Sequence, residues 1–422
     1  MTGPRPGEAG GASGLFAGVD PPSGPATGPV TEQVTEPSPD AVARACLTAT
    51  ASAGDPLMGA LIADEGAATV WDALRTGRRP RIPEKGPVDT YERRFERWRA
   101  QAAGVDPDTL LSAAAESGIR LVVPGDPGWP SQLDQLAEHR PYALWVRGVH
   151  DLRHACLRSV AVVGARAASA YGLHVAGELA WALAERTWST VSGGAYGIDG
   201  AAHRGTLAGG APTVAVLAGG LDLSYPRGHE SLFADIAARG TLVSEHPMGT
   251  SPTRHGFLVR NRIIAALTPG TVVVEAGLRS GALNTARHAQ ELRRVLMAVP
   301  GPVTSALSAG CHRLLREWRA VCVTDAADIT EHVAHIGDHM RPGTGTAMAR
   351  DGLDEESRRV LDAVPERSGA GTATIAATAG IDLDAALGRL GLLAAGGFIE
   401  RTLSGWRVRS GSSGDTGDRV RP

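Results

Sequence analysis

Short apolar runs alternate with longer segments of helical periodicity between residues 119 and 335. The apolar runs cover residues 160–163, 190–192, 213–217, 241–244, 271–275 and 295–299. Helical segments start at Ala170, Ile198, His229 and Ala282, and another lies near Arg260. This alternation is typical of a parallel sheet covered by helices on both faces. The pattern therefore predicts a doubly wound, Rossmann-like α/β domain over residues 119–335.

The region before this domain has a different pattern. Residues 1–40 are rich in Pro, Gly and Thr, which predicts a disordered tail. Residues 41–118 have helical periodicity, and Asp55-Pro56 combines an N-cap with a proline at the first helical position. Tyr91, Phe95 and Trp98 follow at i, i+4 and i+7, as in an amphipathic helix. We predict a small helical domain of the SAM-like kind, with its arginines on a solvated face.

The C-terminal region is predicted to form a third domain. Residues 336–352 have the composition of a linker, and residues 411–422 that of a loose tail. Between them, three helical segments (355–364, 374–379 and 382–393) precede two strand-like segments (398–402 and 406–409). Three helices followed by a hairpin predict a winged-helix domain over residues 353–410.

Composition excludes several classes of protein. The chain has 422 residues and a net charge of −3, so any nucleic acid would bind at a local basic site. The four cysteines form no CxxC pair and have no histidine at zinc spacing, so we expect reduced, buried thiols and no metal. No apolar run could cross a membrane and no secretory signal is recognisable, which predicts a cytoplasmic protein. Lys85 is the only lysine, so phosphate recognition would depend on arginine.

Glycine or polar turns follow several of the predicted strands. The strand ends carry Gly164-Ala165-Arg166, Ser192-Gly193-Gly194, Gly219-Gly220, and Glu275 followed by Ser280-Gly281. In an open α/β sheet these ends converge on one edge, where helix N-termini favour anions. The sequence therefore predicts an anion-binding site at that edge.

The identity of the anion is narrowed by the motifs that the sequence lacks. It has no P-loop, no dinucleotide-binding glycine fingerprint and no acid for a ribose at the second strand, so no nucleotide cofactor is expected. Arg166, and Arg260 with Arg262 around Asn261, suit the phosphates of a polymer backbone. The alternative for Arg260 and Arg262 is an ion pair with an acid at the sheet edge, such as Glu245 or Glu275.

The order and spacing of these motifs resemble the DprA/Smf family of DNA-processing proteins. The matching blocks are 162–166 with 171–172, 192–199 with 202–203, 219–222 with 225–226, 244–245, 260–264, 274–276 with 280–286, and 299–301. The resemblance covers about residues 119–329. It implies a homodimer, not an enzyme, that binds single-stranded DNA and passes it to a RecA-type recombinase in natural transformation.

The resemblance also implies which residues form the DNA site. It places Gly164-Ala165-Arg166 and Arg260-Asn261-Arg262 at a DNA pocket, with backbone donors from Ser192, Gly193 and Gly194. Four departures from the family pattern bear on affinity: Ala165 stands for a frequent Ser or Thr, Leu258 for a proline and His312 for an asparagine, and a pocket lysine has no counterpart.

The sequence leaves two alternative functions. A nucleoside-monophosphate phosphoribohydrolase has a similar fold, and Glu275 with Ser280-Gly281 faintly resembles its site. However, the Pro-Gly-Gly-x-Gly-Thr loop of those enzymes is absent, and Glu275 could instead cap the helix that starts near Gly281. A regulator that reads duplex DNA through the winged helix is disfavoured because Asp382 and Asp384 would repel phosphates.

Overall fold

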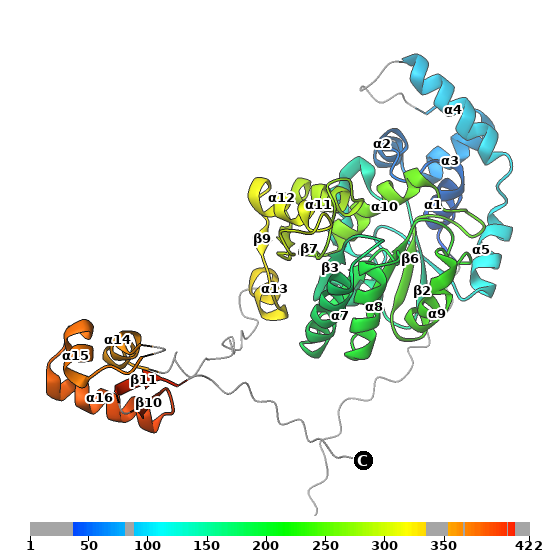
Figure 1. Cartoon of the computed structure of the whole chain (residues 1–422). Helices are drawn as coiled ribbons and strands as arrows, with labels where there is room; N and C mark the ends of the chain where they lie inside the picture. Colours follow the sequence, from blue (N-terminus) through cyan, green and yellow to red (C-terminus); the bar gives the residue numbers. More distant parts are fainter. Residues whose placement is uncertain (1–36, 81–87, 335–352, 366–367, 403, 410–422) are drawn as a thin grey trace, which may run out of the picture. The chain divides into compact units, whose positions relative to one another are not determined.

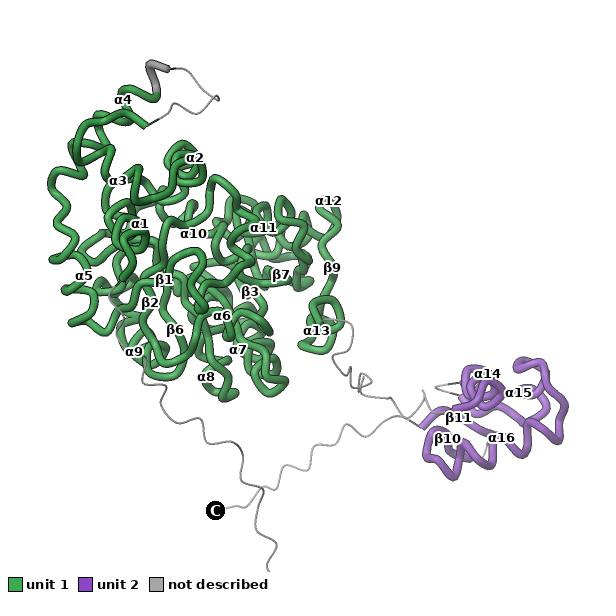
Figure 2. Tube along the Cα trace, turned by 180° about the vertical axis from the view of Figure 1, so that it is seen from behind, with its two compact units in different colours: residues 1–336 green, residues 337–422 purple. Residues whose placement is uncertain are grey.

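The chain is described here by a computed structural model that covers residues 37–80, 88–334, 353–365, 368–402 and 404–409. It divides into two compact units, Met1–Ile336 and Gly337–Pro422 (Figures 1 and 2). The helices that the sequence assigns to a separate domain are thus in the same unit as the α/β region. The predicted linker and C-terminal tail lie outside the described residues, as does nearly all of the predicted N-terminal tail.

Five helices form the N-terminal part of the first unit. They are α1 (Pro39–Thr50), α2 (Pro56–Glu65), α3 (Ala67–Thr76), α4 (Val88–Ala102) and α5 (Pro107–Glu116). Three of them begin with the same device, in which a polar N-cap is followed by proline. Ser38, Asp55 and Asp106 accept hydrogen bonds from the first helical turns of α1, α2 and α5.

The predicted aromatic stripe of α4 is confirmed. Tyr91, Phe95 and Trp98 are each at most 3% exposed and pack with residues of α1, α2 and α3. On the other side of α4, Arg97 and Arg99 are exposed to solvent, as expected for a solvated face. Arg94 pairs with Asp55, the N-cap of α2, so this arginine joins α4 to α2.

A nine-stranded sheet forms the centre of the first unit. Its order is β1-β2-β6-β5-β4-β3-β7-β8-β9. The strands are β1 (Arg120–Val122), β2 (Leu144–Gly148), β3 (Ser159–Val163), β4 (Ser189–Ser192), β5 (Thr213–Leu217), β6 (Thr241–Ser244), β7 (Gly270–Val273), β8 (Val295–Ala298) and β9 (Val321–Cys322). The helical elements that follow are η1 (Ser131–His139), α6 (Leu152–Leu157), α7 (Ala170–Glu185), α8 (Ile198–Ala208), η2 (Arg227–His229), α9 (Glu230–Arg239), α10 (Arg254–Leu267), α11 (Ala282–Glu291), α12 (Ala309–Glu317) and α13 (Ala326–Val333).

The sheet is mixed, which corrects the prediction of a wholly parallel one. Strands β3 to β9 pair in parallel, but β2 pairs antiparallel with both β1 and β6. The prediction from alternating helices and strands was wrong at this edge, because β1 and β2 are joined through the short 3-10 segment η1. An antiparallel pair needs no crossover helix.

Alternate residues of the central strands face two different helical layers. Val160 and Val162 of β3 pack with α7, α8 and α13, whereas Ala161 and Val163 pack with α10, α11 and α12. Both sets are buried, which accounts for the continuous apolar runs in the sequence. Figure 1 shows α7 and α8 side by side in front of the sheet. This two-layer arrangement confirms the α/β prediction.

The strand order reverses between β3 and β7. The chain passes from β3 outward through β4, β5 and β6, and then returns to place β7 on the other side of β3. The loops that leave β3 and β7 therefore diverge above the same point of the sheet. Such a switch point leaves a crevice at the carboxyl ends of the strands.

The second unit contains three helices and a two-stranded antiparallel sheet. The helices are α14 (Glu355–Ala363), α15 (Thr372–Ala379) and α16 (Leu383–Ala395), and the strands are β10 (Ile399–Thr402) and β11 (Gly405–Val408). Val360, Ile375, Leu390 and Leu393 form its core. The order of elements is the one predicted, and the winged-helix assignment itself stays a prediction.

In the part of the chain that the structure describes, no helix is long and apolar enough to cross a membrane. Cys46, Cys156 and Cys311 are buried, and burial raises the pKa of the Cys46 thiol to about 11. Cys322 is exposed, so the expectation that all four thiols are buried was wrong for this one.

Candidate functional site

A cavity of about 570 Å³ lies at the switch point of the sheet. Its walls come from the loop after β3, the loop after β7, and one face of α10. Seven residues that the sequence assigned to the site line it, namely Gly164, Ala165, Arg166, Arg260, Asn261, Ser280 and Gly281. The structure thus brings together most of the predicted site.

The turn after β3 is held tightly in place. The Ala165 backbone N–H donates to the Glu275 carbonyl at 2.6 Å, and the Ile198 N–H donates to the Ala165 carbonyl at 3.2 Å. A Cβ on Gly164 would lie 2.4 Å from the Ile198 side chain, so only glycine fits there. The next residue, Arg166, is exposed, and its guanidinium lies 4.5 Å from the centre of the Phe257 ring.

The lining of this cavity is strongly basic. Arg166, Arg254 and Arg279 are exposed, and Arg260 forms part of the buried wall. Asp199 is the one acid in the lining, and it is also buried. Four arginines against one aspartate give a positive potential, and the N-terminus of α11 adds to it, since its N-cap Gly281 lines the cavity.

Arg260 supports the cavity wall from inside the protein. It is 5% exposed, and its Nη1 donates to the Gly193 carbonyl at 2.8 Å and to the Val216 carbonyl. These bonds fasten α10 to the ends of β4 and β5. The pKa of Arg260 is lowered to about 10, because the effect of burial is larger than the opposing effect of the nearby Asp199 carboxylate. At neutral pH the group is still charged.

The turn after β4 does not offer the backbone donors that the sequence suggested. Ser192, Gly193 and Gly194 are buried and lie outside the cavity lining. The Gly193 N–H donates to Asp199 Oδ2 at 3.1 Å, and the Ser192 hydroxyl donates to the Val162 carbonyl at 2.6 Å. The Gly193 N–H is therefore used within the protein by the buried Asp199 carboxylate, and burial keeps this turn out of the cavity. Burial raises the pKa of Asp199, and Arg260 and the backbone donors lower it.

Arg262 forms the ion pair that was the alternative in the sequence analysis. Its Nη1 and Nη2 donate to the two carboxylate oxygens of Glu245, both at 2.6 Å, and each residue is nearly fully buried. Its Nε donates to the His139 carbonyl at 2.9 Å, and a Cβ on Gly54 would touch its guanidinium. Arg262 therefore joins α10 to the N-terminal helices. It does not line the basic cavity.

Glu275 is engaged at a different helix from the one expected. Its carboxylate accepts from the Ser169 N–H at 2.8 Å and from the Ser169 hydroxyl at 2.7 Å, and Ser169 is the N-cap of α7. It is 2% exposed and outside the cavity lining. At the start of α11 it is Ser280 whose hydroxyl accepts from a backbone N–H, that of Ala282. The arrangement gives Glu275 a structural role.

His203, one helical turn after Asp199 in α8, is a buried neutral base. Its Nδ1 lies 2.8 Å from the Thr213 hydroxyl, which donates its own proton to the Thr190 carbonyl. Nδ1 must therefore carry the proton, and the buried Nε2 has no partner among the described atoms. Burial, together with nearby His229, Arg204 and Arg260, lowers the pKa of His203 to about 3.

Sequence reasoning missed Arg254, Phe257 and Arg279. Arg254 and Phe257 share one face of α10 with Asn261 and Ile264, at spacings of three, seven and ten residues, and all four line the cavity. Helical periodicity could have found the first two, given Asn261 as a starting point. Arg279 lies in the loop after β7, where periodicity gives no signal.

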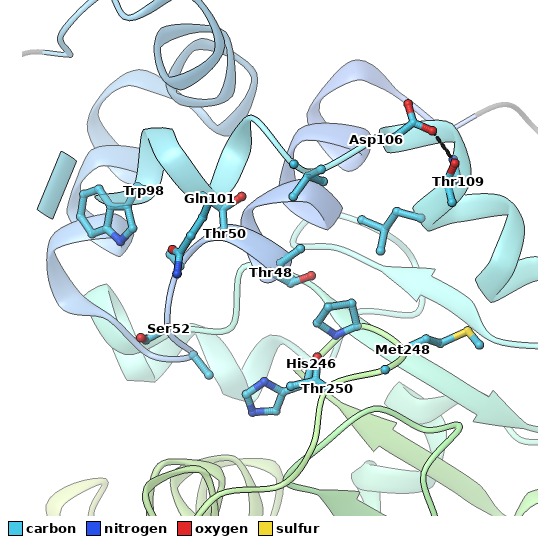
Figure 3. A pocket seen from close by; sticks show the side chains of 18 of the residues that line it. Thr48, Thr50, Ser52, Trp98, Gln101, Asp106, Thr109, His246, Met248 and Thr250 are labelled. Atoms are coloured by element: carbon cyan, nitrogen blue, oxygen red, sulfur yellow. Dashed lines mark hydrogen bonds between the residues drawn. The ribbon is translucent and has the colours of Figure 1, made fainter. Parts of the chain in front are cut away.

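A second, larger cavity lies under the N-terminal helices (Figure 3). It has about 710 Å³ and is lined by α1, α4, the start of α5 and the loop of residues 246–250. Figure 3 shows hydroxyls, an amide and the His246 ring around it, with Asp106 bonded to Thr109. Arg97 and Asp106 are its charged residues, so its lining is close to neutral. None of the residues that the sequence assigned to the site lie there.

Among the described residues, no group of three or more His, Cys, Asp and Glu side chains could hold a metal ion.

Comparisons with known proteins agree with this architecture. The sequence model of the family described as DNA recombination-mediator protein A matches residues 120–334. The chain belongs to this family. The DNA processing protein DprA of Mycobacterium tuberculosis is 48% identical over 318 residues, which cover 72% of this chain and 80% of that protein. The Smf protein of Escherichia coli is 40% identical over 51% of this chain and 56% of its own length.

A solved structure also resembles the chain. The X-ray structure of DNA processing protein A from Streptococcus pneumoniae has 28% sequence identity and a TM-score of 0.58, over 72% of this chain and 100% of that one. Family membership makes the chain a recombination mediator rather than an enzyme. It gives no support to the phosphoribohydrolase alternative, and the buried, bonded state of Glu275 is consistent with that.

Proposed function

We propose that the protein binds single-stranded DNA in the basic cavity at the switch point. Arg166, Arg254 and Arg279 would contact phosphates, and the Gly164-Ala165 turn would let the strand approach the backbone closely. Arg260 and Asn261 would hold the wall in place. The observation that carries this proposal is the Arg166 guanidinium stacked on Phe257 at the mouth of a cavity with four arginines and one acid.

One feature of the cavity lining favours a single strand over a duplex. Phe257 lies in the cavity lining, and an aromatic face there can stack only on a base that is not already stacked in a helix. The cations are arginines, which contact backbone phosphates in any sequence. We therefore expect little base preference.

The family to which the chain belongs suggests a wider role. We propose that the protein acts as a homodimer in the cytoplasm, protects incoming DNA during natural transformation and loads a RecA-type recombinase onto it. The second unit, as a winged helix, would contact protein rather than DNA. In support, Arg389 of α16 is paired with Asp354 at 2.7 Å and with Glu356 at 2.9 Å, so its charge is already compensated.

The test is fluorescence anisotropy with labelled oligo-dT and a duplex of the same length, across a salt series. We expect tighter binding to the single strand, and affinity that falls with salt according to a small number of phosphate contacts. Equal or tighter binding to the duplex would contradict the proposal.

A further inference from the structure

Two exposed tyrosines lie beyond the mouth of the basic cavity. Tyr225 is 49% exposed and Tyr196 is 48% exposed. Neither residue lines the cavity itself. Both lie in loops at the carboxyl edge of the sheet, Tyr225 after β5 and Tyr196 after β4.

Tyr225 contacts an aromatic residue of the cavity, Phe257, in a tilted arrangement. Its ring centre is 5.6 Å from that of Phe257, and Arg166 lies over the same Phe257 ring at 4.5 Å. Arg166 and Phe257 both line the cavity. The series Arg166, Phe257 and Tyr225 therefore leads without a break from the cavity to the surface.

Tyr196 is fixed close to Tyr225 by a short turn. Its hydroxyl accepts from the Gly228 N–H at 3.1 Å, and Gly228 is three residues after Tyr225. Three residues of backbone span at most about 11 Å, so the Tyr196 hydroxyl lies close to the backbone of the loop that carries Tyr225. The ring of Tyr196 meets that of His229 edge to face at 4.9 Å, so its orientation is set by packing.

Charge around the two tyrosines is balanced. Arg227 and Arg204 are exposed there, but so are the acids Asp222 and Glu230. A Cβ on Gly200 would lie 2.6 Å from the His229 ring and 3.2 Å from Arg204 Nη2, which places Arg204 beside the ring that packs on Tyr196. Attraction of phosphates is therefore weak here, and the groups available for contact with a ligand are the rings of the two tyrosines.

We propose that a DNA strand leaving the cavity continues over Tyr225 and then Tyr196, and that each ring stacks on one base. This tyrosine track rests on the proposed function of the cavity, and it extends the binding site towards α8 and α9. Exposed aromatic rings are the sequence-tolerant contacts that single-strand-binding proteins use. The track binds by stacking, whereas the cavity binds by charge.

The test compares oligo-dT of about 4 nucleotides with oligo-dT of about 20, a range that spans the usual site sizes. Tyr225→Ala and Tyr196→Ala should each weaken binding of the long strand at least about fivefold, the lower end of the effect of losing one stacked base. The short strand should bind as before. The salt dependence of long-strand binding should keep its slope, because no phosphate contact is lost.

Two controls separate stacking from other causes. Tyr225→Phe keeps the ring and should bind like the wild type. Trp181→Ala removes another aromatic residue that is 40% exposed, near the end of α7, and should leave binding unchanged. A long strand with 5-iodouracil outside the cavity should also cross-link to the peptides containing Tyr225 and Tyr196.

The outcomes distinguish this proposal from the one on which it rests. If the wild type binds neither length, the proposed function fails and the track with it. If the wild type binds but Tyr225→Ala binds the long strand equally well, the track alone is refuted. Equal losses for both lengths would mean that Tyr225 only supports Phe257, and a changed oligomeric state would mean that the tyrosines meet a second copy of the chain. Either result overturns the track.

Discussion

The two cavities of the first unit differ in size and in chemistry. Volume would favour one of them as the DNA site, and charge favours the other. The cavity under the N-terminal helices is the larger, about 710 Å³ against about 570 Å³. Its charged residues are one arginine and one aspartate, and five of its lining residues carry hydroxyls. The smaller cavity has four arginines and one aspartate and lies where the strand order reverses. A polyanion is attracted by the positive charge of a lining and not by the volume of a cavity. We therefore expect DNA to bind in the smaller cavity.

Two neighbouring arginines of α10 lie on opposite sides of this difference between the cavities. Arg260 and Arg262 are two positions apart in the same helix and are both buried. Arg260 faces the basic cavity, whereas Arg262 faces Glu245 and the loop that contains Gly54, on the side of the neutral cavity. We therefore expect mutations on the two sides to affect different properties, DNA affinity on one and stability on the other.

The largest effect is expected for Arg262→Ala. It leaves the Glu245 carboxylate buried without its partner, which typically costs about 3–5 kcal/mol of unfolding free energy. The measurement is urea unfolding followed by circular dichroism. The double variant Arg262→Met with Glu245→Leu removes both charges and should recover most of the loss. Protein that remains folded should bind oligo-dT like the wild type, and a selective loss of affinity would return Arg262 to the DNA site.

The next effect concerns the basic cavity. Arg166→Ala should weaken oligo-dT binding by about 1–3 kcal/mol, since a charge-assisted contact is lost. It should also reduce the salt slope by about one phosphate equivalent, with little change in stability because Arg166 is exposed. Arg97→Ala is the matched control, because Arg97 is an exposed arginine of the neutral cavity. If both variants lost affinity equally, the two cavities would not differ in function.

Much of the basic cavity could be predicted from the sequence, because the carboxyl ends of parallel strands share one edge. Gly164, Arg166 and Gly281 follow directly from that rule, and the structure places all three in the cavity lining. The rule locates a residue at an edge but does not give the direction of its side chain. Arg260 and Arg262 were therefore treated alike, although one contacts backbone carbonyls and the other an acid 17 positions away.

The parts that could not be predicted depend on contacts distant in sequence. Glu275 accepts from Ser169, which is 106 positions earlier, and no local pattern indicates that pair. The antiparallel edge formed by β1 and β2 was missed for a related reason, because the connection between them contains the 3-10 segment η1 and no α-helix. The cavity under the N-terminal helices combines α1 with a loop about 200 positions away, so only the fold could bring it to notice.

The smallest expected effect is a difference between the two cavities in how a nearby histidine changes stability with pH. The pKa of His203, behind the basic cavity, is lowered to about 3, and positive neighbours such as Arg260 contribute to the lowering. An unfolded histidine titrates near 6.5, so stability is fully present above that pH and is lost as pH falls from 6.5 towards 3. At pH 5.5 the loss from His203 should be about 1.4 kcal/mol relative to pH 8.

His203→Asn keeps a donor for Thr213 and removes the titration, so its unfolding free energy should change less between pH 8 and pH 5.5 than that of the wild type. His246, in the neutral cavity, also has a lowered pKa, but Glu245 opposes the lowering, so His246→Asn should change the pH dependence less. Denaturant unfolding of the three proteins at both pH values measures the difference. A wild-type pH dependence that survives in His203→Asn would show that the acid sensitivity arises elsewhere in the molecule.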